Sequence, residues 1–302
     1  MSCITQNSEI DLQSPIAVVA HDAGAANLIA GWLKDVPTEH IRISIAGPAL
    51  DIFAGEFPHL TNMGMTDALD GAATLLSGTS SRATNIEHEA RVLARERGIH
   101  SIGVIDHWVN YGERFVRNEQ RVLPDEIWVS DEIALSLAQS CFSAHPVRLL
   151  RNRYLDQLVE KISAETLAKT DGKARVLYVL EPIREHWGSN DTPGEFQALD
   201  FFISKLGSLG LGNDTEIRLR AHPSDPPGKY NAWCAAHSRL NLSVDTTQTL
   251  SGLIAWADRV VGCETFAMVI ALHANKQTLS TLPPWAPPCK LPHKGIRMLR
   301  DL

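Results

Sequence analysis

The sequence predicts an α/β protein built from two Rossmann-like domains that face each other across a cleft. Short apolar runs alternate with longer helical patterns over almost the whole chain, which is typical of parallel sheets covered by crossover helices. A chain of 302 residues is long for a single core and suits two domains of ordinary size. With 44% hydrophobic and 21% charged residues, it can bury the interior of both.

The predicted strands of the first domain are 16–20, 41–46, 74–77, 101–105, 126–129 and 147–150. Its predicted helices are 25–34, 48–56, 85–98 and 131–141, and a polar-faced helix follows over 153–169. The predicted strands of the second domain are 175–180, 216–221, 240–244, 259–261 and 277–280. The proline-rich run 282–288 ends the last regular element.

The domain boundary is predicted at a turn cluster over 170–173, after which a fresh apolar strand begins. This gives a flexible polar tail at 1–14, a first domain at 15–170 and a second domain at 171–302. The tail has no basic segment before an apolar core, and no apolar run reaches the roughly 20 residues that span a bilayer. We therefore expect neither a signal peptide nor an integral membrane segment.

The net charge and the cysteine pattern argue against a nucleic-acid-binding protein and against a protein held together by disulfides. The net charge of −7 argues against nucleic-acid binding, which usually needs a basic face to neutralise phosphates. The five cysteines are scattered and form no C-x-x-C pair, so reduced thiols in the cytoplasm are the simplest expectation. They are Cys3, Cys141, Cys234, Cys263 and Cys289.

Two motifs of the second domain predict a phosphate site at the carboxyl ends of its strands. Arg220, His222 and Pro223 follow one strand, and Glu264 and Thr265 stand where another strand turns into a helix. A cationic loop facing free N–H groups at a helix N-terminus can hold a phosphate from two sides. The alternative is structural, because a His-Pro pair can simply end a strand and a threonine can simply cap a helix.

A third strand of the same domain ends in a polar loop. Glu181 is placed to bind a ribose or a reacting hydroxyl, and Arg184 and His186 to bind a phosphate. A surface loop without function is the competing interpretation.

In the first domain, His21 and Asp22 follow the first strand, and Gly24 allows close approach of a ligand. The two side chains suit an acid/base pair, although Asp22 also suits a helix cap. A loop of hydroxyl residues at 77–81 suits either sugar binding or capping. G-x-G-x-x-G is absent, so no dinucleotide fingerprint is present.

The densest polar and aromatic cluster follows the strand 101–105. Asp106 stands where open sheets place catalytic residues, and His107 can relay its proton. Trp108 and Tyr111 are available to stack on a sugar, with Arg114 as a nearby cation. The alternative is an amphipathic loop whose aromatic side chains pack into the protein.

These motifs together resemble small GT-B-type glycosyltransferases, in particular bacterial sialyltransferases, polysialyltransferases and related CMP- or CDP-linked transferases. His222-Pro223 matches the His-Pro element of that family, whose histidine contacts the donor phosphate. Glu264-Thr265 takes the place of a Ser-Ser pair and keeps one hydroxyl. The acidic-acidic-Gly motif of the family's general base is missing, and Asp106 is its positional substitute.

The resemblance implies a metal-independent cytoplasmic transferase of surface-polysaccharide or glycoconjugate synthesis, with a nucleotide sugar and a carbohydrate acceptor as substrates. No cofactor is expected. Two alternatives stay open: a sugar-nucleotide hydrolase or non-hydrolysing epimerase that uses His21 or Asp22, and a non-catalytic scaffold of the same fold.

If the boundary is placed correctly, limited proteolysis should cut first between about 165 and 175 and leave two compact halves, because linkers between domains are exposed and make few contacts. Mass spectrometry of the fragments locates the cut. First cleavage deep inside either half would contradict the boundary.

Overall fold

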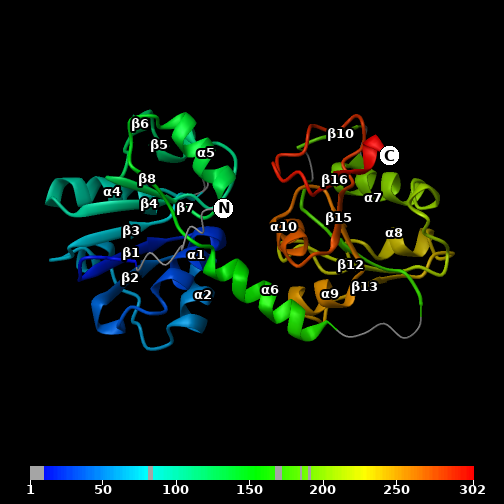
Figure 1. Ribbon diagram of the computed structural model, residues 1–302, viewed down its shortest axis with the longest axis horizontal. Coiled ribbons are helices and arrows are strands. Elements are labelled where there is room, and N and C mark those ends of the chain that lie inside the picture. Colours follow the sequence, from blue (N-terminus) through cyan, green and yellow to red (C-terminus); the bar gives the residue numbers. More distant parts are fainter. Residues whose placement is uncertain (1–9, 81–83, 167–171, 184–185, 190–191) are drawn as a thin grey trace, which may run out of the picture. The chain divides into compact units, whose positions relative to one another are not determined.

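The computed structural model describes residues 10–80, 84–166, 172–183, 186–189 and 192–302. The chain divides into two compact units, Met1–Tyr154 and Leu155–Leu302. Each unit contains a parallel six-stranded sheet with helices packed on it (Figure 1). The predicted fold class of two Rossmann-like domains is confirmed. The boundary predicted at 170/171 lies outside the described residues and stays a prediction.

The sheet of the first unit has the strand order β2-β1-β3-β4-β7-β8. Its strands are β1 (Ile16–Ala20), β2 (Ile41–Ile45), β3 (Thr74–Ser77), β4 (His100–Val104), β7 (Glu126–Val129) and β8 (Val147–Leu149). Its helices are α1 (Ala23–Leu33), α2 (Ala49–Glu56), α3 (Met65–Ala68), α4 (Ile86–Arg97) and α5 (Glu132–Cys141). The short elements are η1 (Thr38–His40), η2 (Gly112–Phe115) and the hairpin of β5 (Val116–Arg117) and β6 (Gln120–Arg121). Because β2 and β3 pair with opposite sides of β1, the direction of the sheet reverses there.

Helix α6 (Arg153–Glu165) starts where the first unit ends and is shorter than the predicted helix 153–169. The sheet of the second unit has the order β13-β12-β9-β14-β15-β16. Its strands are β9 (Arg175–Val179), β12 (Glu216–Arg220), β13 (Leu242–Val244), β14 (Arg259–Gly262), β15 (Gln277–Ser280) and β16 (Arg297–Met298). Its helices are α7 (Gly194–Ser204), α8 (Asn231–Ala236), α9 (Leu250–Trp256) and α10 (Phe266–His273). The remaining elements are β10 (Gly188–Ser189), β11 (Thr192–Pro193), η3 (Gly207–Leu209) and η4 (Leu299–Asp301).

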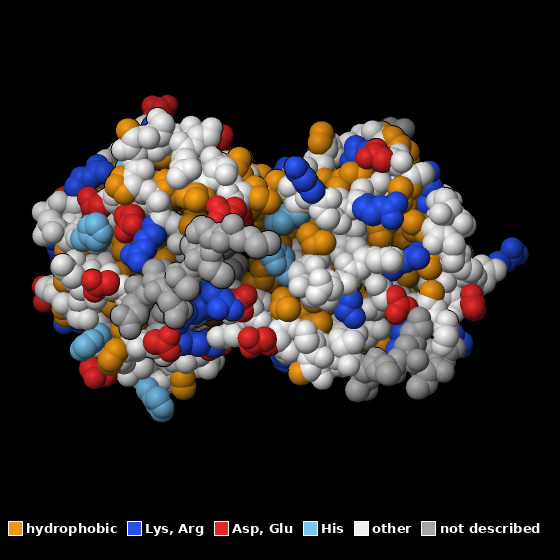
Figure 2. Space-filling view, in the orientation of Figure 1, with side chains coloured by type: hydrophobic (Ala, Val, Ile, Leu, Met, Phe, Trp, Pro, Cys, Tyr) orange, Lys and Arg blue, Asp and Glu red, His pale blue; other side chains and the backbone are white. Residues whose placement is uncertain are grey.

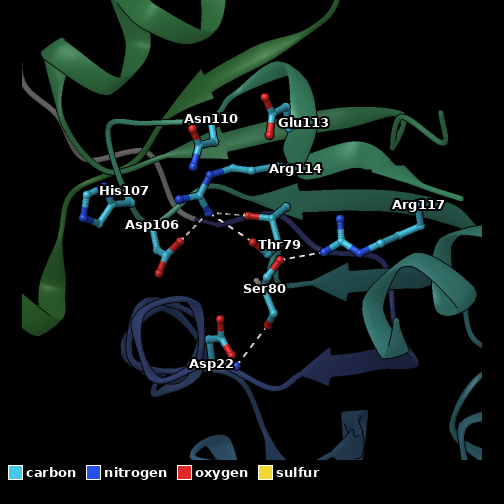
Figure 3. Close-up of a pocket in the computed structure, with 9 residues that line it drawn as sticks. All are labelled: Asp22, Thr79, Ser80, Asp106, His107, Asn110, Glu113, Arg114 and Arg117. Atoms are coloured by element: carbon cyan, nitrogen blue, oxygen red, sulfur yellow. Dashed lines mark hydrogen bonds and ion pairs between the residues drawn. The ribbon is translucent and has the colours of Figure 1, made fainter. Parts of the chain in front are cut away.

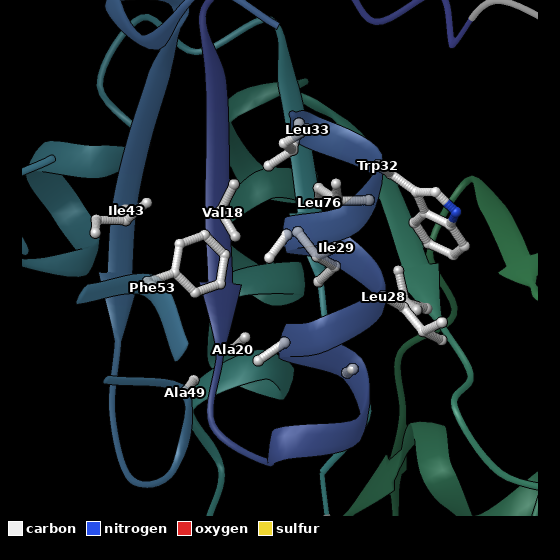
Figure 4. Close-up of a cluster of buried hydrophobic side chains, with 14 of the residues drawn as sticks. Val18, Ala20, Leu28, Ile29, Trp32, Leu33, Ile43, Ala49, Phe53 and Leu76 are labelled. Atoms are coloured by element: carbon white, nitrogen blue, oxygen red, sulfur yellow. The ribbon is translucent and has the colours of Figure 1, made fainter. Parts of the chain in front are cut away.

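The core of the first unit follows the two-residue period of β1. Val18 and Ala20 face α1 and α2, and Figure 4 shows Ile29 and Phe53 of these helices packed around them. Val19 faces the opposite side, in a separate cluster with α4. Both faces of β1 are therefore buried between helical layers, which explains why the strand is a continuous apolar run.

The structure differs from the sequence prediction near both ends of the chain. Ile10 and Leu12, from the predicted flexible tail, pack against the core of the first unit. After the proline-rich run, β16 pairs in parallel with β15 and forms the edge of the sheet. A strand of two residues is too short to be predicted from hydrophobic periodicity.

On the face drawn in Figure 2, basic and acidic side chains are interspersed over both units. This distribution fits the modest negative net charge and does not form the basic stripe typical of nucleic-acid binding. No helix in the described ranges is long and apolar enough to cross a membrane.

Candidate active site

Three strand-to-helix turns of the first unit meet at the carboxyl edge of its sheet, where the strand order reverses. They follow β1, β3 and β4, which are neighbours in the sheet. A pocket of about 350 Å³ opens between them and the segment that carries η2 (Figure 3). It is lined by Asp22, Thr79, Ser80, Asp106, His107, Asn110, Glu113, Arg114 and Arg117. This is the place where open α/β sheets bind ligands.

Asp106 forms an ion pair with Arg114 on the wall of this pocket. The distance from Arg114 Nη1 to Asp106 Oδ1 is 2.9 Å. The arginine side chain is 13% exposed and the aspartate side chain is 17% exposed. The same Nη1 donates to the backbone and side-chain oxygens of Thr79, each at 3.1 Å. Arg114 therefore fixes the direction of the Asp106 carboxylate and connects it to the turn after β3 (Figure 3).

Gly24 leaves room for the other oxygen of Asp106. A Cβ added to Gly24 would lie 1.8 Å from Asp106 Oδ2, a separation that no side chain tolerates. Gly24 lies in the first turn of α1, so the carboxylate stands against the positive end of that helix. From the sequence we expected a ligand to approach Gly24 closely; in the structure the Asp106 side chain takes up this space.

His21 and Asp22 form a dyad at the start of α1. His21 Nδ1 and Asp22 Oδ1 are 2.6 Å apart, and Asp22 lines the pocket. Asp22 occupies the N-cap position of α1, but its side chain makes no capping hydrogen bond to the helix. The alternative interpretation of Asp22 as a side-chain cap is therefore not supported.

A buried carboxylate holds two of the turns together. Glu87 of α4, 2% exposed, accepts a hydrogen bond from the backbone N–H of His21 at 3.0 Å and a second from the Ser80 hydroxyl. The Ser80 oxygen accepts in turn from the backbone N–H of Asp22 at 3.1 Å. Burial raises the pKa of Glu87, while the bond from Ser80 and the charge of Arg91 lower it.

Arg91 lies four residues after Glu87 on α4 and is buried beside the turn that follows β3. It donates to the Ser77 hydroxyl at 3.2 Å and to the Gly78 carbonyl at 3.0 Å. Burial lowers its pKa to about 10, and the charge of Glu87 opposes that shift. Neither Glu87 nor Arg91 was among the predicted site residues. The only sequence signal for this buried pair is that the two residues lie four positions apart on one helix. The same spacing is equally typical of an exposed ion pair, so it does not predict a buried one.

The aromatic residues beside Asp106 do not line the pocket. Trp108 is buried, with its indole N–H donating to Asp131 Oδ2 at 2.8 Å, and Tyr111 is buried as well. The expectation that they stack on a sugar is wrong, because their hydrophobic area is used in packing. His107 lines the pocket, and its Nδ1 accepts from the backbone N–H of Trp108 at 2.9 Å.

In the second unit, Glu181 binds the turn that connects β14 to α10. Glu181 follows β9, and its Oε1 accepts the backbone N–H of Glu264 at 2.6 Å, just before α10 begins. The N–H groups of Cys263 and Thr265 also bond to this carboxylate. Glu181 thus binds N–H groups of the turn before α10, and the predicted phosphate site at the N-terminus of that helix stays a prediction.

The other predicted donor-site residues make local contacts. Thr265 caps α10 by accepting the Ala267 N–H at 3.4 Å, and Glu264 pairs with Lys290 at 3.1 Å. Arg220 donates to the Gln248 carbonyl at 2.7 Å. Arg220 is the last residue of β12, whereas Glu264 and Thr265 follow β14, and β9 lies between these two strands in the sheet.

His222 and Pro223 lie in the loop after β12. The His222 Nδ1 and the Ser224 hydroxyl are 2.8 Å apart, and the His222 N–H donates to Asp225. Asp225 is itself held by Lys229 at 2.7 Å. The loop is thus fixed from within the unit. Arg184 lies outside the described residues.

No group of three or more histidine, cysteine or acidic side chains in the described ranges is arranged to hold a metal ion. The described cysteines, which exclude Cys3, are free thiols.

No protein-family model matches this sequence, and no curated protein matches it either. Solved structures do match its fold. The UDP-GlcNAc 2-epimerase from Neisseria meningitidis bound to UDP-GlcNAc is similar with a TM-score of 0.63 and 13% identity, over 90% of this chain and 83% of that one. A putative UDP-N-acetylglucosamine 2-epimerase from Listeria monocytogenes gives 0.59 and 13%, over 89% and 79%. The enzyme of the same name from Rickettsia bellii gives 0.53 and 10%, over 88% and 78%. At these identities the likeness establishes the two-domain fold.

Gly24→Ala should destabilise the first unit by roughly 1–3 kcal/mol, because the new methyl group forces Asp106 out of its place. Gly55→Ala is the matched control, since a Cβ at Gly55 of α2 meets nothing within 4 Å. That control should be neutral or stabilising by up to about 1 kcal/mol. Urea unfolding measures both. Equal stability of the two variants would contradict the close approach of Asp106 to α1.

Glu181→Gln should remove a pH dependence of stability in the second unit. Burial raises the pKa of Glu181 from 4.5 to about 7, so in that interval the folded chain holds a proton that the unfolded chain has released. The free energy of unfolding of the parent should therefore fall, relative to the variant, as the pH rises from 4.5 through 7.

Urea unfolding of parent and variant across that pH range makes the measurement. Glu39→Gln, at an exposed glutamate, is the control and should run parallel to the parent. If Glu181→Gln runs parallel too, Glu181 is not a titrating group of this interval.

Proposed function

We propose that the protein is a nucleotide-sugar enzyme whose reaction takes place in the pocket of the first unit, with Asp106 as its base. The observation that carries the proposal is the Asp106–Arg114 ion pair, fixed at 2.9 Å on a pocket wall at the reversal point of the sheet. A carboxylate held there by an arginine and a helix N-terminus can accept a proton from a bound hydroxyl. The fold shared with an epimerase bound to UDP-GlcNAc supports a nucleotide sugar as the substrate.

The reaction that this geometry favours is glycosyl transfer to a hydroxyl. The acceptor oxygen forms the new bond to the anomeric carbon, the bond from that carbon to the donor phosphate breaks, and the hydroxyl proton passes to Asp106. A carboxylate stabilised by Arg114 suits this step, because the hydroxyl becomes acidic as its bond forms.

The leaving nucleotide is assigned to the second unit. Arg220 and His222 supply cationic or hydrogen-bonding groups at the carboxyl edge of its sheet, and Thr265 and Glu264 mark the start of α10. Glu181 binds N–H groups of the turn before α10, so a phosphate would bind beside this carboxylate or displace it. We expect neither a metal nor another cofactor to be required, and we propose a carbohydrate of a surface polysaccharide or glycoconjugate as the acceptor.

Epimerisation or hydrolysis of the nucleotide sugar is the second candidate. The His21–Asp22 dyad supplies a second acid/base group to the same pocket, and that group could activate water or move a proton of the sugar. Incubation of the protein with UDP-GlcNAc and with CMP-, CDP- and other UDP-linked sugars, without acceptor, separates the candidates. Rapid turnover without acceptor supports the second candidate, and turnover only with acceptor supports transfer.

Binding of the nucleotide is tested first by thermal unfolding with CMP, CDP, UDP and GDP. A nucleotide at 100 times its dissociation constant should add about 2.7 kcal/mol to the stability of the folded state. Absence of stabilisation by any of the four would contradict a nucleotide-sugar enzyme and favour a scaffold of this fold.

Asp106→Asn should lower kcat by about 10²–10⁴ and leave nucleotide affinity within a few-fold of the parent, because the amide cannot accept the proton. Turnover and calorimetry on the same folded variant measure both quantities. Asp51→Asn, on an exposed residue of α2, is the matched control. Full activity of Asp106→Asn would exclude Asp106 as the base and direct attention to His21 and Asp22.

A further inference from the structure

The guanidinium group of Arg114 has one nitrogen that the protein does not use. Its Nη1 donates to Asp106 Oδ1 at 2.9 Å and to the backbone and side-chain oxygens of Thr79 at 3.1 Å. Its Nε donates to the Val109 carbonyl at 3.0 Å. Its Nη2 has no hydrogen-bond partner among the described residues. Arg114 therefore keeps a cationic donor that neither the Asp106 ion pair nor the surrounding turns require.

This unused nitrogen is open to the pocket. The Nε atoms of Arg91 and Arg300 are closed to solvent and have no partner among the described residues, but Arg114 Nη2 is not an atom of this kind. A nitrogen that has no partner in the described part of the chain and is not closed off meets solvent. Arg114 lines the pocket, and Figure 3 shows its guanidinium group next to Asp106 among the lining side chains.

The neighbouring donors on the pocket wall are used within the protein. Each nitrogen of the Arg117 guanidinium donates to a backbone carbonyl. The Thr79 hydroxyl donates to the Val104 carbonyl at 2.8 Å, and the Ser80 hydroxyl donates to a buried carboxylate. Of the two arginines on this wall, Arg114 is the one with a nitrogen that no acceptor among the described residues contacts.

The direction of Arg114 Nη2 is fixed before any ligand binds. The guanidinium group is planar and rigid, so the bonds made by Nε and Nη1 also fix the position of Nη2. The backbone is held as well: Asn110 has a φ of 60°, and its carbonyl accepts the N–H groups of Glu113 and Arg114 at 3.1 Å each. A donor that is already in place does not need to reorganise when a ligand arrives.

An oxygen bound by Nη2 would lie beside the Asp106 carboxylate. Nη1 and Nη2 are bonded to the same carbon, and Nη1 holds Asp106 Oδ1. An arginine that binds one carboxylate through two nitrogens keeps neither of them for a ligand. Here the ion pair uses a single nitrogen, and Asp106 Oδ2 is turned toward Gly24. A ligand hydroxyl at this place can accept from Nη2 and donate to Asp106.

We propose that Arg114 is a catalytic residue that binds the reacting hydroxyl oxygen of the acceptor through Nη2. The assignment rests on the proposed function and deepens it. The hydroxyl proton passes to Asp106, the electron pair of the oxygen forms the bond to the anomeric carbon, and the bond from that carbon to the donor phosphate breaks. Negative charge grows on the oxygen as its proton leaves, and a fixed cationic donor stabilises that charge. Arg114 keeps all its protons.

Arg114→Lys tests this contact, because a lysine keeps the positive charge and can keep a bond to Asp106 but has no second nitrogen. Ligand NMR on the full chain measures the dissociation constants of the methyl pyranosides of the gluco, galacto, manno and N-acetylgluco series. Each sugar is added with and without CMP, CDP, UDP and GDP. Arg239→Lys, at an exposed arginine, is the matched control.

We expect at least one pyranoside to bind saturably and Arg114→Lys to weaken its binding by about ten-fold or more, because a hydrogen bond to a charged group is lost. Arg239→Lys should bind as the parent does. Asp106→Asn separates contact from positioning. If Arg114 acted only through Asp106, Arg114→Lys would have no further effect in the Asp106→Asn background, whereas a direct contact predicts a similar loss there.

Nitrogen NMR of the parent gives a second measurement that does not depend on the folding of a variant. The side-chain signals of Arg114, identified by their loss in Arg114→Lys or by their contact with Asp106, should shift and gain protection from exchange when the pyranoside binds. Unchanged Arg114 signals, absence of saturable binding, or a loss that vanishes in the Asp106→Asn background would each overturn the assignment. Normal transfer by Arg114→Lys would overturn this assignment alone, and sugar binding through Arg114 without any nucleotide binding would overturn only the proposed function.

Discussion

The site of the first unit depends on one buried carboxylate. Glu87 reaches from α4 to the turns after β1 and β3, accepting from the His21 backbone and the Ser80 hydroxyl. Parallel strands bring their carboxyl ends to one edge of the sheet, but nothing in strand pairing fixes how the turns beyond that edge lie relative to each other. Glu87 supplies that constraint, because a buried carboxylate must find hydrogen-bond donors and here finds them in two different turns.

Arg91 makes the burial of Glu87 tolerable. The two side chains lie four residues apart on α4, and the positive charge of Arg91 partly offsets the desolvation of the carboxylate. Arg91 also donates to the turn after β3, so the pair acts as a single polar unit within an apolar surrounding. Removing either partner would take away part of the compensation for burying the other, so each should help to hold the turns in place.

The two units use charge at a helix N-terminus in opposite ways. In the first unit, Asp106 stands against the start of α1 and still lines a pocket, where a ligand can reach it. In the second unit, Glu181 accepts the N–H groups of the turn that leads into α10. The same fold thus provides one carboxylate on a pocket wall and one that is bound by the backbone of its own unit. Local contacts, rather than the fold, decide which role a residue takes.

The sequence by itself determined the fold class, the principal strands and the candidates at the strand ends, because hydrophobic periodicity and turn residues are local signals. It correctly placed Asp22, Asp106 and His107 at one edge of the sheet. Tertiary structure decided that Trp108 packs inward, that Glu181 binds the turn before α10 and that Glu87 joins two turns. These outcomes depend on which groups compete for burial and for backbone donors across distant segments, and no spacing along the chain records that competition.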